Sequence, residues 1–138
     1  MKIMVMDGQG GGIGAALIKG LRDTLGNDLE ILALGTNSIA TSRMMKAGAN
    51  RGATGENAIV RSSRAVDFII GPLAVLMANT MMGEVTPGMA EAVSSSPARK
   101  VIIPLTQERV RVVGLTDEPL PHLVSQVVKL IEEECRHV

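Results

Sequence analysis

The residues best suited to chemistry in this sequence are five glycines within one run of seven residues. Glycine reaches positive φ without a Cβ clash, and its bare backbone lets N–H groups approach phosphate oxygens closely. An apolar strand is predicted before the run and a helix after it, and the start of such a helix offers unpaired N–H donors and a positive dipole end. The run therefore predicts a site for a phosphate-bearing ligand. Its members are Gly8, Gln9, Gly10, Gly11, Gly12, Ile13 and Gly14.

This glycine turn fits two nucleotide-binding patterns. Gly10, Gly12 and Ala15 match GxGxxA, the dinucleotide fingerprint with alanine in the last position. Gly8, Gly12 and Gly14 match GxxxGxG, which resembles the cofactor loop of short-chain dehydrogenases. The alternative is a close-packed turn without a ligand, in which glycine only relieves crowding. We favour ligand binding because the glycine density and the strand–turn–helix context agree.

Two later turns are expected at the same site, because each follows a predicted strand. In a doubly wound sheet the ligand lies at the carboxyl ends of the strands, where the strand order reverses. The glycine turn and these two segments should therefore form one pocket. The residues added to the site are Gly35, Thr36, Asn37, Gly71 and Pro72.

Two absences argue against hydride transfer by the mechanism of the short-chain dehydrogenases. The chain has no tyrosine, so the Tyr-x-x-x-Lys pair of the short-chain dehydrogenases cannot exist. The turn after the second strand offers glycine, threonine and asparagine where dinucleotide-binding proteins usually carry an acid for the ribose hydroxyls. These residues could hydrogen-bond a ribose or a 2′-phosphate, but they do not form the usual signature. Binding without that chemistry survives, and NAD or NADP is the expected cofactor if one is bound.

Other polar residues have a structural interpretation beside a functional one. Asp7 is expected to orient the glycine turn, with ribose or metal binding as the alternatives. Thr54 and Glu56 are expected to cap a helix, although either of them, or Asn57, could touch the ligand. Cys135 and the two histidines are too scattered to form a metal site. Catalytic residues are left unassigned.

The elements that must position these residues alternate between strands and helices. Residues 2–6 and 29–34 predict strands around a helix, which makes a parallel βαβ unit. A short link between the last two predicted strands suggests an antiparallel hairpin, and apolar residues at helical spacing predict a final helix capped by Thr116 or Asp117. The remaining predictions are helices at 42–47, 56–64, 73–82 and 87–93, a loop at 48–55, and strands at 66–70, 100–105 and 110–115.

These elements predict one α/β domain over residues 1–138. We expect a three-layer, Rossmann-like, doubly wound and mostly parallel sheet of about five strands, with an antiparallel strand allowed at one edge. Hydrophobic residues make up 46% of the chain, enough to bury a core. The apolar stretch at 73–82 favours a homodimer or a larger homo-oligomer. Asn79, Thr80 and Glu84 in or just after it need polar partners, in the pocket or across a subunit interface.

The composition of the chain limits the classes of partner that it can bind. The formal net charge is +0 and aromatic residues make up 1%, so neither phosphate attraction nor base stacking supports nucleic-acid binding. The longest apolar stretch, 68–82, is too short to span a bilayer, so we expect no membrane partner and a cytoplasmic location. The remaining expected partner is a nucleotide-like small molecule.

Several motifs together resemble a small family of uncharacterised bacterial proteins, catalogued as a domain of unknown function. They are DGQGGGIG at 7–14, ALGTN at 33–37, KAGANRGATGEN at 46–57, IIGP at 69–72 and EPLPHL at 118–123. The resemblance covers the chain nearly end to end. It implies a Rossmann-like domain, without an established activity and without catalytic residues to transfer.

Three functional hypotheses follow. The first is a protein that binds a nucleotide or dinucleotide phosphate at the glycine turn, with or without a reaction. The second is a small enzyme acting on a phosphorylated metabolite. The third is a non-catalytic, homo-oligomeric structural or regulatory subunit whose glycine turn serves packing only.

Overall fold

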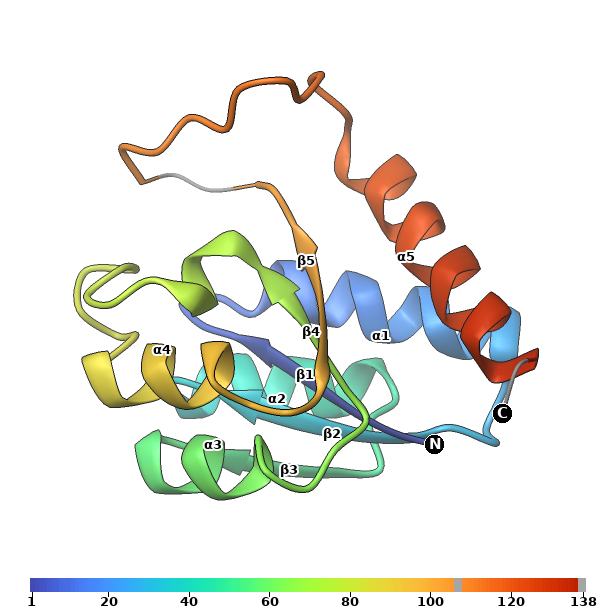
Figure 1. The fold of residues 1–138 in the computed structure, drawn as a ribbon. Helices are drawn as coiled ribbons and strands as arrows, with labels where there is room; N and C mark the ends of the chain where they lie inside the picture. The colour runs from blue at the N-terminus through green and yellow to red at the C-terminus, as the bar shows by residue number, and fades with distance from the viewer. Residues whose placement is uncertain (106–107, 137–138) are drawn as a thin grey trace.

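The computed structural model describes residues 1–105 and 108–136. Its centre is a five-stranded sheet in the order β3-β2-β1-β4-β5, and every pair of neighbouring strands is parallel (Figure 1). The strands are β1 (Lys2–Asp7), β2 (Glu30–Gly35), β3 (Arg51–Thr54), β4 (Phe68–Pro72) and β5 (Arg99–Ile103). The helices are α1 (Gly12–Leu25), α2 (Ser38–Ala47), α3 (Glu56–Ser62), the 3-10 helix η1 (Leu73–Leu76), α4 (Pro87–Ser94) and α5 (Leu120–Arg136).

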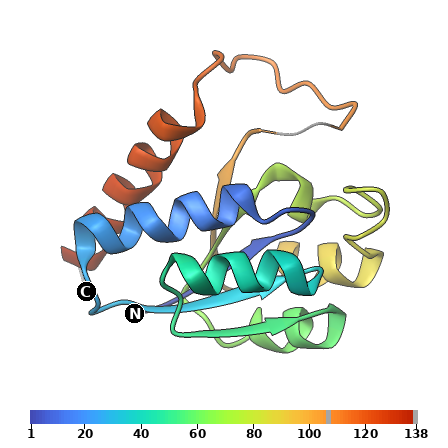
Figure 2. The same ribbon diagram turned by 180° about the vertical axis from the view of Figure 1, so that it is seen from behind.

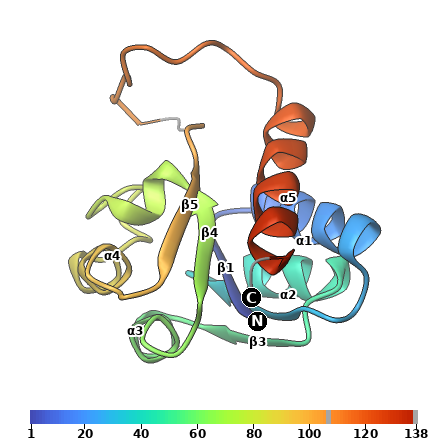
Figure 3. The same ribbon diagram turned by 45° about the vertical axis from the view of Figure 1, so that its right-hand side comes forward.

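Helices cover both faces of the sheet, as the three-layer Rossmann-like prediction requires. Helices α1, α2 and α5 lie on one side, and α3 and α4 lie on the other (Figure 3). Seen from behind, α1 and α2 run next to each other across their face (Figure 2). Successive side chains of the central strand β1 enter opposite cores: Ile3 and Val5 one, Met4 and Met6 the other. This explains why β1 is an unbroken apolar run.

The strand order places a crevice beside β1. From β1 the chain moves outward to β2 and β3, then returns to the other side of β1 to form β4 and β5. The loops after β1 and β4 therefore leave their strands in opposite directions and leave space between them. In open α/β sheets this reversal point is where ligands bind.

The predicted antiparallel edge is wrong. Within the described ranges no strand is antiparallel, and residues 110–115 are irregular chain. Pairing of this segment would bury no apolar side chains in a core, because its valines Val110, Val112 and Val113 are exposed. In addition, Gly114 has a φ of 93°, which bends the backbone out of an extended path. Residues 106–107, in the link between the two predicted strands, lie outside the described residues.

Two further predictions need correction. Residues 51–54, predicted as loop, form edge strand β3, whose side chains are all exposed and so show no apolar alternation; pairing with β2 creates it. The predicted helix at 73–82 is only the single turn η1. Beyond it, Asn79, Met81 and Met82 have φ of 68°, 56° and 55°. Thr80 Oγ1 donates to the carbonyl oxygens of Ala74 and Met77, which favours a turn over a continuing helix.

One predicted helix cap is confirmed, and the others are not. Thr86 caps α4 through the amide of Met89, and Pro87 follows at the first helical position, as expected. Helix α2 begins four residues earlier than predicted, at Ser38, because Asn37 caps it. Gly55, not Thr54, precedes α3. Helix α5 starts at Leu120, so neither Thr116 nor Asp117 is its N-cap.

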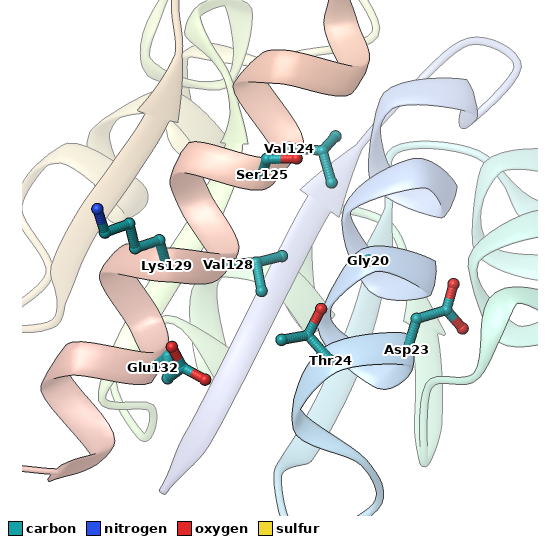
Figure 4. Close-up of a pocket in the computed structure, with 8 residues that line it drawn as sticks. All are labelled: Gly20, Asp23, Thr24, Val124, Ser125, Val128, Lys129 and Glu132. Carbon is teal, nitrogen blue, oxygen red and sulfur yellow. The ribbon is translucent and has the colours of Figure 1, made fainter.

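Helix α5 packs closely on α1 at one glycine. A Cβ on Gly20 would lie 2.5 Å from Val124 Cγ1 and 3.3 Å from Val128 Cγ2. A groove of about 330 Å³ remains between the two helices, bordered by polar side chains such as Asp23 and Lys129 (Figure 4). In the described ranges, no helix is both long and apolar enough to cross a membrane.

Candidate functional site

The main cavity of interest has a volume of about 750 Å³ and lies at the carboxyl ends of β1 and β4. This is the point where the strand order reverses, and the volume falls in the usual range for small-molecule sites. The glycine turn forms one wall, and the chain after β4 forms the other. The lining residues are Asp7, Gly8, Gln9, Gly10, Gly11, Gly12, Ile13, Pro72, Ala74, Asn79, Met81, Met82, Leu105 and Glu108.

The structure brings together part of the predicted site. Residues 8–13 and Pro72 line the cavity. Gly71 is not among the lining residues, and a Cβ there would meet the carbonyl oxygen of Met6 at 2.5 Å. Gly35 ends β2 and pairs with Asp7, the amide of Thr36 donates to the carbonyl oxygen of Asp7, and Asn37 donates to that of Gln9. None of these three residues lines the cavity. Ligand binding by any of these residues stays a prediction.

Asp7 holds the glycine turn in shape. Its Oδ1 accepts a hydrogen bond from the amide of Gly8 at 2.8 Å, and its Oδ2 accepts one from the amide of Gly14 at 2.7 Å. The side chain is almost fully buried, and this burial raises the pKa of the carboxyl above its ordinary 3.8, although the backbone hydrogen bonds oppose the rise. Asp7 therefore orients the turn, as expected from its position.

Glu84 ties the turns after β1 and β2 together. Its Oε1 accepts hydrogen bonds from the amide of Gln9 at 2.8 Å, Thr36 Oγ1 at 2.7 Å and Asn37 Nδ2 at 2.8 Å. Burial alone would raise the pKa of this carboxyl, but the three hydrogen bonds lower it below its ordinary value. Sequence reasoning singled out Glu84 as needing partners and did not locate them, since they are far away in the chain.

Packing and backbone conformation require three of the five glycines in the turn. A Cβ on Gly8 would lie 2.4 Å from Thr36 Oγ1. Gly11 has a φ of 73°, and its Cβ would lie 2.8 Å from the backbone of α2. A Cβ on Gly14 would lie 2.4 Å from Met44 Sδ. The packing interpretation of the turn therefore holds at these positions.

Gly10 and Gly12 have no such explanation. Neither has a positive φ, and a Cβ at either position would contact only the guanidinium of Arg43, at 3.8 Å and 3.4 Å respectively. Among the described residues, neither backbone amide has a protein acceptor. Both glycines line the cavity. The two bare positions thus combine free amide donors with space for an approaching group, at the start of a helix.

Arg43 adds a positive charge beside these glycines. It projects from α2, is exposed, and its Nη1 donates to the carbonyl oxygen of Gly10 at 3.3 Å. Sequence reasoning missed this residue because the contact depends on how α2 packs against the turn. Two free amides and a guanidinium together suit an anion, phosphate above all.

The remaining polar candidates serve the fold. Thr54 Oγ1 shares a hydrogen bond with Thr41 Oγ1 at 2.7 Å. Glu56 accepts a hydrogen bond from Thr86 Oγ1, which links α3 to α4. Neither Thr54 nor Glu56 lines the cavity. No group of three or more His, Cys, Asp or Glu that could hold a metal ion occurs in the portion that the structure describes.

Comparisons with known proteins give a family and a fold. The family model described as a domain of unknown function (DUF3842) matches residues 2–136. A search of curated proteins finds no match. Among solved structures, the chain is similar to a dodecameric FMN-dependent Ubix-like decarboxylase from Escherichia coli O157:H7, at 16% identity and a TM-score of 0.53. The similarity covers 97% of this chain and 94% of that chain, and at this identity it establishes the fold alone.

Proposed function

We propose that this chain, which belongs to the family described as a domain of unknown function (DUF3842), binds a nucleotide through its phosphate at the glycine turn. Membership of that family agrees with the resemblance of the sequence motifs. The observation that carries the proposal is the pair Gly10 and Gly12, whose missing side chains the protein itself does not require. A ligand that approaches the backbone closely would explain why both positions are glycine.

The chemistry of the surroundings supports an anion at this pair. The amides of Gly10 and Gly12 are free to donate, and Gly12 is the first residue of α1, where the helix dipole is positive. The guanidinium of Arg43 adds a full positive charge. A phosphate held there would place the rest of the nucleotide in the adjoining cavity.

The cavity suits an organic group attached to that phosphate. Apolar side chains on its far wall, including Met81, Met82 and Leu105, can cover a flat ring. The similar solved structure is FMN-dependent, which makes flavin mononucleotide the first probe to try. The expectation of NAD or NADP draws no support from that comparison.

Assembly and location are proposed on separate grounds. The similar solved structure is dodecameric, and Met82 is 98% exposed on the rim of the cavity, so we infer that the chain forms a homo-oligomer. A cytoplasmic location and the absence of nucleic-acid binding remain predictions. We assign no reaction to the site.

The test is ligand-induced stabilisation. Purified protein is heated with FMN, NAD, NADP, ATP or coenzyme A, and mass spectrometry identifies any compound that co-purifies. A ligand that binds only the native state raises the melting temperature with increasing concentration. We expect FMN to do so with the wild-type chain and not with Gly12→Val, whose ligand-free melting temperature should match the wild type.

The second candidate function is a non-catalytic structural or regulatory subunit, favoured by the packing role of Gly8, Gly11 and Gly14. It predicts no stabilisation by any of the five compounds, no co-purifying nucleotide, and wild-type behaviour of Gly12→Val in assembly and stability. That combination would refute nucleotide binding.

A further inference from the structure

The end of β2 decides whether a second nucleotide fits. In dinucleotide-binding folds, an acidic residue there accepts hydrogen bonds from the ribose hydroxyls of the adenosine half. Residues 35–37, at the end of β2, contain no acid. A carboxylate nevertheless occupies this place, because Glu84 reaches it from the turn that precedes α4.

Protein groups already occupy one oxygen of this carboxylate. Glu84 Oε1 accepts from the amide of Gln9, from Thr36 Oγ1 and from Asn37 Nδ2, all at 2.7–2.8 Å. Asn37 Nδ2 also donates to the carbonyl oxygen of Gln9 at 2.9 Å, which joins the two turns directly. A ribose hydroxyl that approached Oε1 would therefore have to displace one of these protein donors.

The space between the turns after β1 and β2 is also filled. A Cβ on Gly8 would lie 2.4 Å from Thr36 Oγ1, 2.5 Å from Met81 Sδ and 3.0 Å from Glu84 Oε1. These three side chains therefore fill the space next to Gly8 on that side of the turn. The cavity lies on the other side of the turn, beside β4.

The turn that carries Glu84 is internally braced. The amide of Asn79 donates to the carbonyl oxygen of Val85 at 2.7 Å, and the amide of Val85 donates to that of Thr80 at 3.2 Å. Thr80 Oγ1 in turn anchors the segment to η1 through the carbonyl oxygen of Ala74 at 2.6 Å. Glu84 is therefore held against the glycine turn and is not a loose surface side chain.

We propose that Glu84 is a specificity-determining residue, which closes the position of a second nucleotide and restricts the site to mononucleotides. This inference rests on the proposed function and names its ligand class. The hydrogen bonds that lower the pKa of Glu84 keep the carboxylate ionised at neutral pH, so a second phosphate near it would also meet a like charge.

The experiment compares FMN with NAD by calorimetric titration of the wild-type chain, Glu84→Ala and Glu84→Gln. We expect the wild type to bind FMN and to bind NAD more weakly by roughly tenfold or more, as loss of charge-assisted hydrogen bonds implies. Glu84→Ala should reduce that preference by about tenfold. Glu84→Gln keeps the shape and one oxygen acceptor, so it should keep most of the preference.

Two controls make the result decisive. Glu91→Ala removes an exposed glutamate of α4 and should keep the wild-type preference. If Glu84→Ala does not fold, Thr36→Val removes one of the hydrogen bonds to Glu84 and should shift the preference in the same direction by less. Equal affinity of the wild type for FMN and NAD, or an unchanged preference in a folded Glu84→Ala, overturns the role of Glu84 alone. Absence of nucleotide binding in the wild type overturns the proposed function with it.

Discussion

Replacing single glycines of the turn by alanine distinguishes the glycines that a bound ligand needs from those that the fold needs. Gly10→Ala and Gly12→Ala place a methyl group where only the flexible end of Arg43 lies, at 3.8 Å and 3.4 Å. Gly14→Ala places the same methyl group 2.4 Å from Met44 Sδ and 3.0 Å from Asp7 Cβ. The three changes are chemically identical and differ only in surroundings.

Gly10→Ala and Gly12→Ala should change the stability in the opposite direction to Gly14→Ala. At Gly10 and Gly12 the backbone φ suits alanine, so the free energy of unfolding should stay level or rise by about 0.4–1 kcal/mol, because the unfolded chain loses freedom. At Gly14 the methyl group overpacks a buried contact, which should lower the free energy of unfolding by about 1–3 kcal/mol. For binding, the methyl at Gly10 or Gly12 should cost about one charge-assisted hydrogen bond, about 1.5–3 kcal/mol.

Urea denaturation measures the first quantity, and calorimetric titration with FMN measures the second. A loss of about 1.5–3 kcal/mol corresponds to roughly tenfold to 150-fold weaker binding. The reasoning is refuted if Gly10→Ala and Gly12→Ala destabilise the fold as much as Gly14→Ala does. It is equally refuted if both variants bind FMN as tightly as the wild type while the wild type binds it.

Further predictions concern the charges, the helix pair and the assembly. Burial raises the pKa of Asp7 above 3.8, so its contribution to stability is complete below pH 3.8 and is lost as pH rises through the raised pKa. Urea denaturation at several pH values should therefore show the wild type losing stability relative to Asp7→Asn across that window. Parallel stability profiles of the two proteins would contradict this. Arg43→Ala should weaken FMN binding up to about fivefold in titrations, whereas Lys46→Ala on the same helix should not; equal effects would remove Arg43 from the site. Gly20→Val should lower the free energy of unfolding by about 1–3 kcal/mol, because the valine side chain would displace α5. Amide hydrogen exchange in α5 should become faster for the same reason. An unchanged exchange rate would show that the packing of α1 and α5 does not depend on this contact. Light scattering after size-exclusion chromatography should give a mass above 14.5 kDa, and Met82→Lys should lower it; a wild-type monomer would contradict the assembly.

Much of the fold followed from local signals in the sequence. The apolar run of β1, the glycine turn and the cap formed by Thr86 and Pro87 each act within a few residues, and the structure contains all three elements. Strand β3 could not be predicted, because its exposed side chains show no pattern and only pairing with β2 makes it a strand. The apolar composition of residues 73–82 predicted a helix, but hydrogen bonds from Thr80 favour a tight turn.

The residues of the candidate site also differ in whether local sequence could predict them. The glycine turn is local, so the sequence marked it, whereas Arg43 and Glu84 reach it from α2 and from the turn before α4. Their roles depend on which elements the sheet order brings together, and that order is not visible in any short segment. Glu84 shows the consequence best. An acid is missing from the position after β2 where a motif search would look, yet a carboxylate stands there in space.

The number of glycines in the turn is therefore a poor measure of ligand binding. Gly8, Gly11 and Gly14 would be needed even in a protein that binds nothing, because side chains or a positive φ demand them. Only Gly10 and Gly12 carry information about a ligand, since their surroundings accept a methyl group without strain. A relative of this chain that keeps the first three glycines and replaces the other two should share the fold and lack the phosphate site. Titration of such a chain with FMN would test this, and tight binding there would show that the bare amides of Gly10 and Gly12 are not the anchor.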